Sequence, residues 1–164
     1  MKKTIVVYGS STGTCESIAG DIAFKLGCEE INVQDFSSDQ IAEYDNLILG
    51  TSTWGSGEIQ DDWYDGVKLL KESDLSNKTV ALFGCGDSQS YCDTFCGGMS
   101  EIYNAVKEAG ANVIGSVDAS EYDYEDSEAV VDGKFVGLAL DNDNEEDKTP
   151  ARIDAWIAEI MPKL

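Results

Sequence analysis

The chain has 164 residues, of which 42% are hydrophobic, and this length and composition suit one folded domain with a substantial core. Its 11 Lys and Arg against 32 Asp and Glu give a formal net charge of −21, so DNA, RNA and anionic lipid surfaces would repel it. It contains no histidine, which excludes Ser-His-Asp and Cys-His catalysis and metal sites built on histidine.

The first predicted element is a strand over residues 4–8, where apolar and β-branched residues follow one another as in a strand buried on both faces. This run is too short for the core of a signal peptide or for a membrane span, so we expect a cytoplasmic protein with reduced thiols. The spacing of Cys85, Cys92 and Cys96 does not follow the common iron–sulfur motifs, and we expect no metal site.

Helices and strands then alternate along the chain. Ile18, Ile22 and Leu26 recur every four residues, which predicts an amphipathic helix over 14–26. Further strands are predicted at 31–36, 46–51, 79–84 and 113–117, and further helices at 63–70, 102–109 and 149–160. Because the strands are apolar without a period of two, we predict an open parallel sheet with helices on both faces.

An acidic stretch interrupts this alternation near the end of the chain. Residues 118–133 contain many Asp and Glu and no Lys or Arg, and a second strand-like run follows at 134–140. We expect an insertion that splits the last strand position of the sheet or pairs at its edge.

Three loops with unusual composition follow the first, third and fourth predicted strands, where parallel sheets bind ligands. The first, residues 9–16, is rich in Gly, Ser and Thr and leads directly into a helix, so its N–H and O–H groups can converge on an anion. It lacks the lysine of a Walker loop and the GxGxxG pattern, which favours a bound monophosphate. A plain strand-to-helix turn capped by Ser or Thr would have the same composition.

The other two loops contribute aromatic residues. Trp54 stands among glycines and hydroxyl residues, where its ring can cover a flat ligand or fold back onto a neighbouring helix. In the third loop Tyr91 supplies a second ring, and Asp87 can accept a hydrogen bond from a ligand or from a local turn. An anion site beside two aromatic rings describes a planar ring that carries a phosphate, such as flavin mononucleotide (FMN).

These motifs resemble those of the long-chain flavodoxins. Residues 10–14 are similar to the family's phosphate loop, Ser/Thr-x-Thr-Gly-x-Thr, and residues 52–63 look like its second flavin loop. Residues 83–87 with Tyr91 resemble the third loop, and residues 134–144 resemble the segment that follows the long-chain insertion. The resemblance extends over essentially the whole chain.

The resemblance implies a single flavodoxin-like α/β domain over residues 1–164, with a doubly wound, open, parallel five-stranded sheet in the order 2-1-3-4-5 and an insertion at about 118–133. It also implies non-covalent FMN, with Trp54 and Tyr91 on the two faces of the ring. Cys15 stands where the family usually has Thr, so one hydroxyl donor to the phosphate is lost. The implied FMN-binding residues are Ser10, Ser11, Thr12, Gly13, Thr14, Cys15, Thr53, Trp54, Gly55, Cys85, Gly86, Asp87, Tyr91 and Thr94.

By this resemblance the protein is a low-potential one-electron carrier that cycles FMN between semiquinone and hydroquinone, and it is not an enzyme. The Gly55 carbonyl would turn toward flavin N5, and the negative charge of the protein would disfavour the anionic reduced flavin. We expect a monomer whose acidic rim attracts basic faces of flavodoxin or ferredoxin reductases and other low-potential oxidoreductases, although such carboxylates can equally be ordinary solvated surface. The rim residues are Glu58, Asp61, Asp62, Asp65, Asp93, Asp141, Asp143, Glu145, Glu146 and Asp147.

Two other functions are compatible with the same fold class. One is an FMN-dependent quinone or nitro reductase, which would need a substrate pocket over the ring and a site for a nicotinamide. The other is a phosphoacceptor signalling module, but that fold needs acidic residues where the first strand here ends in Tyr8, Gly9 and Ser10.

Overall fold

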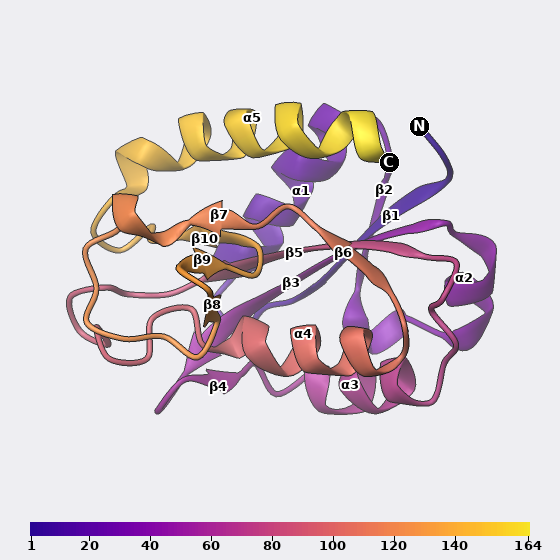
Figure 1. The fold of residues 1–164 in the computed structure, drawn as a ribbon, viewed down its shortest axis with the longest axis horizontal. Coiled ribbons are helices and arrows are strands. Elements are labelled where there is room, and N and C mark those ends of the chain that lie inside the picture. The colour runs from indigo at the N-terminus through magenta and orange to yellow at the C-terminus, as the bar shows by residue number, and fades with distance from the viewer.

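The computed structural model describes residues 1–164 and contains a mostly parallel sheet between two layers of helices (Figure 1). The central strands pair in parallel in the order β2-β1-β3-β5. Their bounds are β1 (Thr4–Gly9), β2 (Glu29–Asn32), β3 (Asn46–Trp54) and β5 (Thr79–Cys85). The predicted α/β class with a parallel sheet is confirmed.

The edge beyond β5 is shared by two short strands. β6 (Asn112–Ile114) pairs with the first half of β5, and β10 (Leu138–Leu140) pairs with its second half, both in parallel. One edge position is therefore filled by two segments that lie on either side of the acidic stretch.

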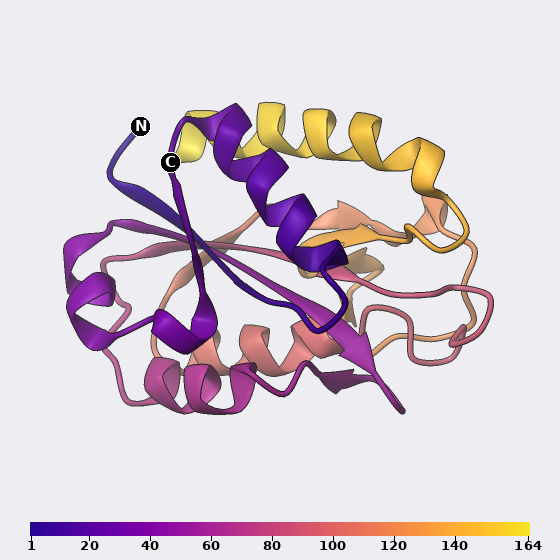
Figure 2. The same cartoon turned by 180° about the vertical axis from the view of Figure 1, so that it is seen from behind.

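Helices cover both faces of this sheet. α1 (Thr14–Leu26) and α5 (Thr149–Ile160) lie on one face, and α3 (Trp63–Lys71) and α4 (Gly98–Glu108) on the other (Figures 1 and 2). Both chain ends lie at the end of the sheet opposite the carboxyl ends of the central strands (Figure 1). None of the helices has the length and apolar character needed to cross a membrane.

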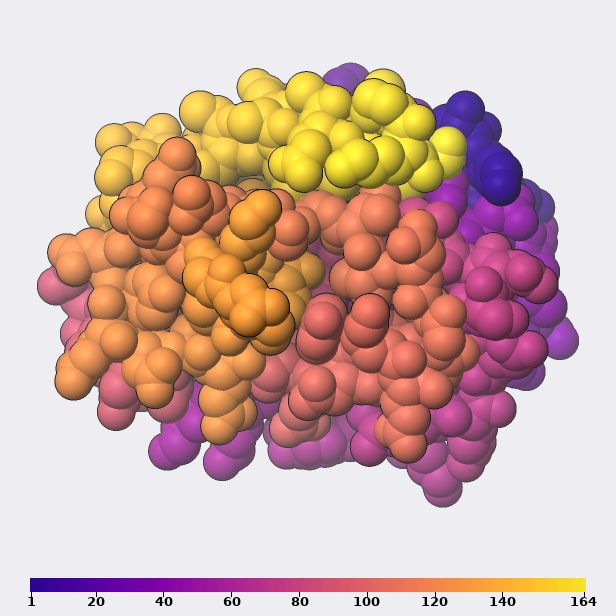
Figure 3. Space-filling view, in the orientation of Figure 1, coloured from indigo at the N-terminus to yellow at the C-terminus, as the bar shows by residue number.

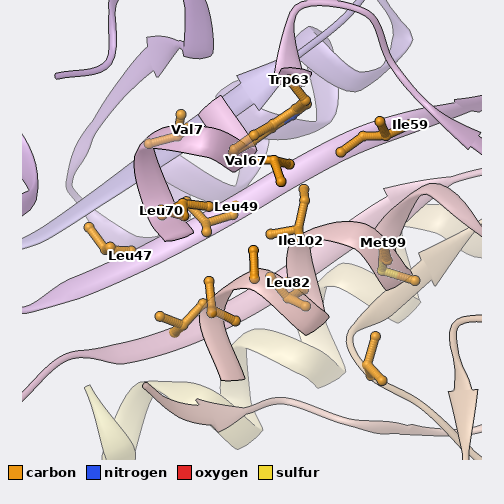
Figure 4. Packing of buried hydrophobic residues seen from close by; sticks show 14 of the residues in the cluster. Val7, Leu47, Leu49, Ile59, Trp63, Val67, Leu70, Leu82, Met99 and Ile102 are labelled. Carbon is orange, nitrogen blue, oxygen red and sulfur yellow. The ribbon is translucent and has the colours of Figure 1, made fainter. Parts of the chain in front are cut away.

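The two hydrophobic clusters explain why the strands lack a period of two. Val6 and Ile48 pack with α1 and α5, whereas their chain neighbours Val7 and Leu49 pack with α3 and α4. Figure 4 shows the cluster that contains Val7 and Leu49, in which side chains of α3 and α4 meet those of the strands. Because alternate residues are buried on opposite faces, the middle of each central strand is a continuous run without charged or polar side chains, as in residues 5–7, 47–49 and 80–83.

The second strand, predicted at 31–36, is wrong at both ends, and its first residue is Glu29. The predicted strand at 31–36 ends at Asn32, and Val33–Asp35 forms a 3₁₀ turn instead. The Asn32 side chain accepts a 2.9 Å hydrogen bond from the Gln34 N–H and so stabilises this turn. The short helix α2 (Ser38–Glu43), which begins with a capping box between Ser37 and Gln40, was not predicted.

The strand predicted at 113–117 also ends early, because the chain leaves the main sheet after Ile114. The acidic stretch then forms a second, antiparallel sheet in the order β7-β9-β8. Its strands are β7 (Val117–Asp118), β8 (Val130–Val131) and β9 (Lys134–Phe135). The residues of this stretch form a continuous surface next to α5 (Figure 3).

The strand-like run at 134–140 is two strands in different sheets. β9 belongs to the small sheet and β10 to the main one, with Gly137 between them. A Cβ atom on Gly137 would lie 2.2 Å from the carbonyl oxygen of Leu82, so only glycine fits where the chain crosses onto β5.

The remaining elements are short. They are the strand β4 (Glu58–Ile59), which forms a hairpin with the end of β3, and the 3₁₀ turns Ala119–Glu121, Glu146–Lys148 and Met161–Lys163.

Candidate functional site

A cavity of about 260 Å³ lies at the carboxyl ends of β1, β3 and β5, with the segment after β10 as its fourth wall. The three loops singled out in the sequence therefore meet in one place. The lining residues are Thr12, Thr14, Ser52, Thr53, Trp54, Gly55, Cys85, Gly86, Asp87, Tyr91, Thr94, Phe95, Cys96, Asn142 and Asp143.

Most of the predicted site residues line this cavity, and Ser10, Ser11, Gly13 and Cys15 do not. Five lining residues were not among the predicted FMN-binding residues, although one of them, Asp143, was predicted as part of the acidic rim. Ser52, Asn142 and Asp143 carried a usable signal, because they lie near the carboxyl ends of buried strands at the edge of the sheet where a ligand is expected. Phe95 and Cys96 are apolar or weakly polar residues of a long loop and gave no such signal.

The first loop leaves backbone donors free at the start of α1. The N-cap residue is Gly13, and no side chain caps the helix. The first N–H to find a helical partner is that of Ser17, which donates to the Gly13 carbonyl at 3.0 Å. The N–H groups of the preceding first-turn residues have no acceptor within the helix, so this end of α1 is suited to an anion.

Within the same loop the Gly13 N–H donates a 3.0 Å hydrogen bond to the Ser10 hydroxyl. The Ser10 side chain therefore stabilises the turn of the loop itself. Thr12 and Thr14 are the residues of this loop that line the cavity.

The side chain of Cys15 does not take part in this anion site. It is fully buried in the core with Ile18 and Ile22 of the same helix. A hydrogen bond with Cys85, together with burial, raises the pKa of the Cys15 thiol well above its usual value. Its side chain is thus buried in the core, and what this position can offer to an anion at the start of α1 is its backbone N–H.

Trp54 and Tyr91 are the exposed aromatic side chains at this cavity, with 42% and 52% of their surface accessible. The indole N–H of Trp54 donates a 2.9 Å hydrogen bond to the Ser52 hydroxyl, which fixes the ring near the end of β3. Neither ring is packed into the core, so both offer apolar surface that a flat ligand can cover.

The hairpin that carries Trp54 turns at Gly55, which has a φ of 53°. Beyond the turn, Glu58 pairs with Trp54 and Ile59 with Thr53. The Thr53 hydroxyl accepts a 3.2 Å hydrogen bond from the Gly98 N–H at the start of α4. The hairpin is thus fixed to α4, while its turn residue keeps a conformation that favours glycine.

Asp87 lines the cavity and also stabilises the third loop. Its Oδ1 accepts hydrogen bonds from the N–H groups of Ser90 at 2.9 Å and Gln89 at 3.1 Å, and from Asn144 Nδ2 at 2.8 Å. The bond from Ser90 is the main cause that lowers the pKa of Asp87.

The acidic stretch supports the far end of this loop. The Phe95 N–H donates to the Asp126 carbonyl at 3.3 Å, and Ser127 Oγ donates to the Phe95 carbonyl. The Phe95 ring also packs edge-on against Phe135 of β9, with 5.7 Å between ring centroids. The stretch therefore helps to position the loop that carries Tyr91.

Two carboxylates after β10 differ in their surroundings. Asp141 is fully buried and accepts hydrogen bonds from the N–H groups of Ser88 at 3.2 Å and Asn144 at 3.1 Å, so it is not part of an exposed acidic rim as expected. Asp143 lines the cavity. Burial raises the pKa of Asp143, and the charges of Asp87 and Asp141 raise it further.

Comparison with known proteins gives consistent matches over the whole chain. The family model described as flavodoxin matches residues 6–156. Flavodoxin 1 of Azotobacter vinelandii is 44% identical over 171 residues, covering 100% of this chain and 98% of that protein. Flavodoxin 1 of Escherichia coli K12 is 38% identical and covers 100% of this chain and 96% of that protein.

Solved structures agree with these matches. The crystal structure of Fusobacterium nucleatum flavodoxin, whose title describes it as bound to flavin mononucleotide, superimposes with a TM-score of 0.94. That protein is 35% identical in sequence, and the match covers 100% of this chain and 99% of that one.

Proposed function

Because the chain belongs to the flavodoxin family, we propose that it binds FMN non-covalently in this cavity and carries electrons between redox proteins. It is an electron carrier and not an enzyme with a substrate of its own. The observation that supports this function most is the meeting of an uncapped helix N-terminus and two exposed aromatic rings at one cavity.

The residues present fit the phosphate end of FMN. The uncapped N-terminus of α1 supplies backbone N–H donors, and Thr12 and Thr14 add hydroxyl groups at the cavity wall. No cation is needed here, because N–H and O–H groups can share the charge of a phosphate among several hydrogen bonds.

The residues also fit the ring end. Trp54 and Tyr91 would lie against the isoalloxazine ring and shield it from water. Bound FMN supplies redox chemistry in which electrons are accepted and released one at a time. The Gly55 carbonyl would accept a hydrogen bond from flavin N5 when that atom carries a proton.

The charges around the cavity would lower the reduction potential. Asp87 and Asp143 both line the cavity, and the whole chain carries a net charge of −21. These negative charges oppose the addition of an electron to the bound group. Each 1.4 kcal/mol of such opposition lowers a one-electron potential by about 60 mV.

Redox proteins with basic faces are the partners that this surface favours. Exposed carboxylates lie close to the aromatic residues: Glu58 pairs with Trp54 across the hairpin, and Asp93 is two residues after Tyr91 in the third loop. Electrostatic attraction would speed encounter with such partners, and the rate would fall as salt rises. Stopped-flow reduction by a basic-faced reductase tests this, and a rate independent of salt would contradict it.

The proposed function is tested by adding FMN to the apoprotein and following flavin fluorescence. We expect one FMN to be bound per chain, and the loaded protein to accept electrons from a flavodoxin or ferredoxin reductase but not from NADPH alone. Rapid oxidation of NADPH by the loaded protein with a quinone as acceptor would favour the FMN-dependent quinone or nitro reductase instead.

A further inference from the structure

Gln60 lies directly after β4 and is 2% exposed, although its side chain is polar. Its Nε2 donates to the Ser11 hydroxyl at 3.0 Å and to Asp62 Oδ2 at 2.9 Å. Its Oε1 accepts a hydrogen bond from the Asp62 N–H at 3.0 Å. A buried side chain from the second loop therefore reaches the first loop, far away in sequence.

These partners fix the orientation of the amide. In the flipped orientation Oε1 would face the Asp62 carboxylate and Nε2 would face the Asp62 N–H, and both contacts would be repulsive. The backbone of Gln60 is held as well, because its N–H donates to Thr51 Oγ1 at 3.2 Å. Gln60 is thus a rigid link between β3 and the first loop.

Ser11 is exposed and does not line the cavity, so a direct role at its wall does not explain this link. The hydroxyl of Ser10 is used within the loop, as the acceptor for the Gly13 N–H. The bond from Gln60 to Ser11 instead connects a side chain of this loop to a different part of the chain. Without it, the loop would be free to sample conformations in which its N–H groups point apart.

We propose that Gln60 is a positioning residue for the phosphate end of the cofactor. By holding Ser11 it keeps the first loop in the shape that directs its backbone N–H groups to one point. A phosphate then binds more tightly at that point, because the loop is already ordered and loses less conformational entropy on binding. This inference rests on the proposed function, because it takes FMN as the ligand.

A positioning role for Gln60 predicts that its loss affects only a ligand that carries a phosphate. A general loss of stability would affect every flavin equally. Riboflavin has the ring and the ribityl chain of FMN but no phosphate. A residue that positions the phosphate loop changes the affinity for FMN and not that for riboflavin. Both affinities are measurable by quenching of flavin fluorescence with the apoprotein.

The test compares Gln60→Met, which keeps the volume and removes both N–H donors, with Ser11→Ala and the double variant. Gln34→Met is the matched control, because Gln34 Nε2 also donates to Asp62, at 2.8 Å, but does not contact the first loop. We expect Gln60→Met to weaken FMN binding by about five- to tenfold, as for the loss of one partly buried hydrogen bond, and riboflavin binding by less than about twofold. Gln34→Met should leave both affinities within about twofold of wild type.

The double variant supplies the second readout. Because Gln60 acts on the loop by holding Ser11, adding Ser11→Ala to Gln60→Met should change FMN affinity no further. Equal losses for FMN and riboflavin, an unchanged FMN affinity, or additive losses in the double variant would each overturn the proposal. If Gln60→Met does not fold, as judged by circular dichroism, Ser11→Ala alone decides between the outcomes. A loss of affinity that is selective for FMN supports the proposal, and the absence of such a loss overturns it.

If the wild-type apoprotein binds neither FMN nor riboflavin, the proposed function fails together with the inference.

Discussion

Asn144 donates a 2.8 Å hydrogen bond from its side-chain amide to the carboxylate of Asp87, and so ties the segment after β10 to the third loop. The same amide donates to the buried carboxylate of Asp141 at 3.1 Å. Two walls of the cavity are thereby held by one side chain.

We predict that Asn144→Ala lowers the free energy of unfolding by about 1–3 kcal/mol, because the carboxylates of Asp87 and Asp141 both lose hydrogen bonds from its side-chain amide, although Asp141 keeps those from Ser88. Urea unfolding followed by circular dichroism measures this. Asn104→Ala, at an exposed position of α4, is the control and should change the free energy by less than about 0.5 kcal/mol. Equal effects of the two substitutions would show that the bridge contributes nothing.

The ionisation of Asp143 should destabilise the folded state, whereas the ionisation of most carboxylates in proteins stabilises it. Burial and the neighbouring Asp87 and Asp141 raise its pKa above the ordinary 3.8. The folded state therefore binds this proton more tightly than the unfolded state, and the ionised group destabilises the fold. That penalty is fully present above the raised pKa and is lost as the pH falls toward and below the ordinary value.

We therefore predict that Asp143→Asn stabilises the protein at pH 7 and has no effect at about pH 3, where the native Asp143 is itself neutral. Urea unfolding at the two pH values measures the difference. Asp123→Asn, at an exposed position of the acidic stretch, is the control for removing one charge from the chain. The same gain at both pH values, or the same gain in the control, would contradict the assignment.

The aromatic residues should contribute to binding of the ring and not of the phosphate. We predict that Trp54→Ala and Tyr91→Ala each weaken FMN binding by about 10- to 100-fold, corresponding to about 1.4–2.7 kcal/mol of lost stacking. Riboflavin binding should weaken by the same factor, in contrast to the Gln60 variants. Tyr64→Ala removes an exposed aromatic side chain of α3 that does not line the cavity, and it should leave both affinities unchanged.

Gly55 should control how far apart the two one-electron potentials lie. A Cβ atom there would lie 3.4 Å or more from its nearest neighbours in Glu58, so Gly55→Ala fits the space but strains a residue whose φ is 53°. We predict that this strain hinders the turn of the carbonyl toward flavin N5 and narrows the separation of the two potentials in potentiometry. Gly133→Ala introduces comparable strain at the β8–β9 turn, where φ is 77°, and should leave the potentials unchanged. A separation that stays constant in both variants would rule out this role for Gly55.

The sequence predicts the layers of the fold and the place of the site because both follow from local patterns. Apolar strands without a period of two imply a doubly covered sheet, and the loops after such strands meet at one edge. The helix α2 escaped prediction because it spans six residues and buries only Ile41. The extent of the edge strands β6 and β10 and the sheet that each residue joins escaped prediction, because each strand contains only three residues and its position depends on pairing with the distant β5.

The burial of Cys15 could have been predicted from the sequence. It precedes Ile18, Ala19 and Ile22 at spacings of three, four and seven, so it belongs to the buried face of α1 and not to the loop. By contrast, no local pattern indicates that Asp141 is buried, since its burial depends on hydrogen bonds from Ser88 and Asn144. Nor does any pattern in the acidic stretch indicate that it supports the third loop through Phe95.

The central claim, an FMN-dependent carrier of single electrons, is tested most directly by anaerobic potentiometric titration of the FMN-loaded protein with absorbance as the readout. We predict two separate one-electron steps, the second at the lower potential, because the negative charge around the cavity opposes the second electron. A single two-electron step, or an apoprotein that cannot be loaded with FMN at all, would contradict the claim.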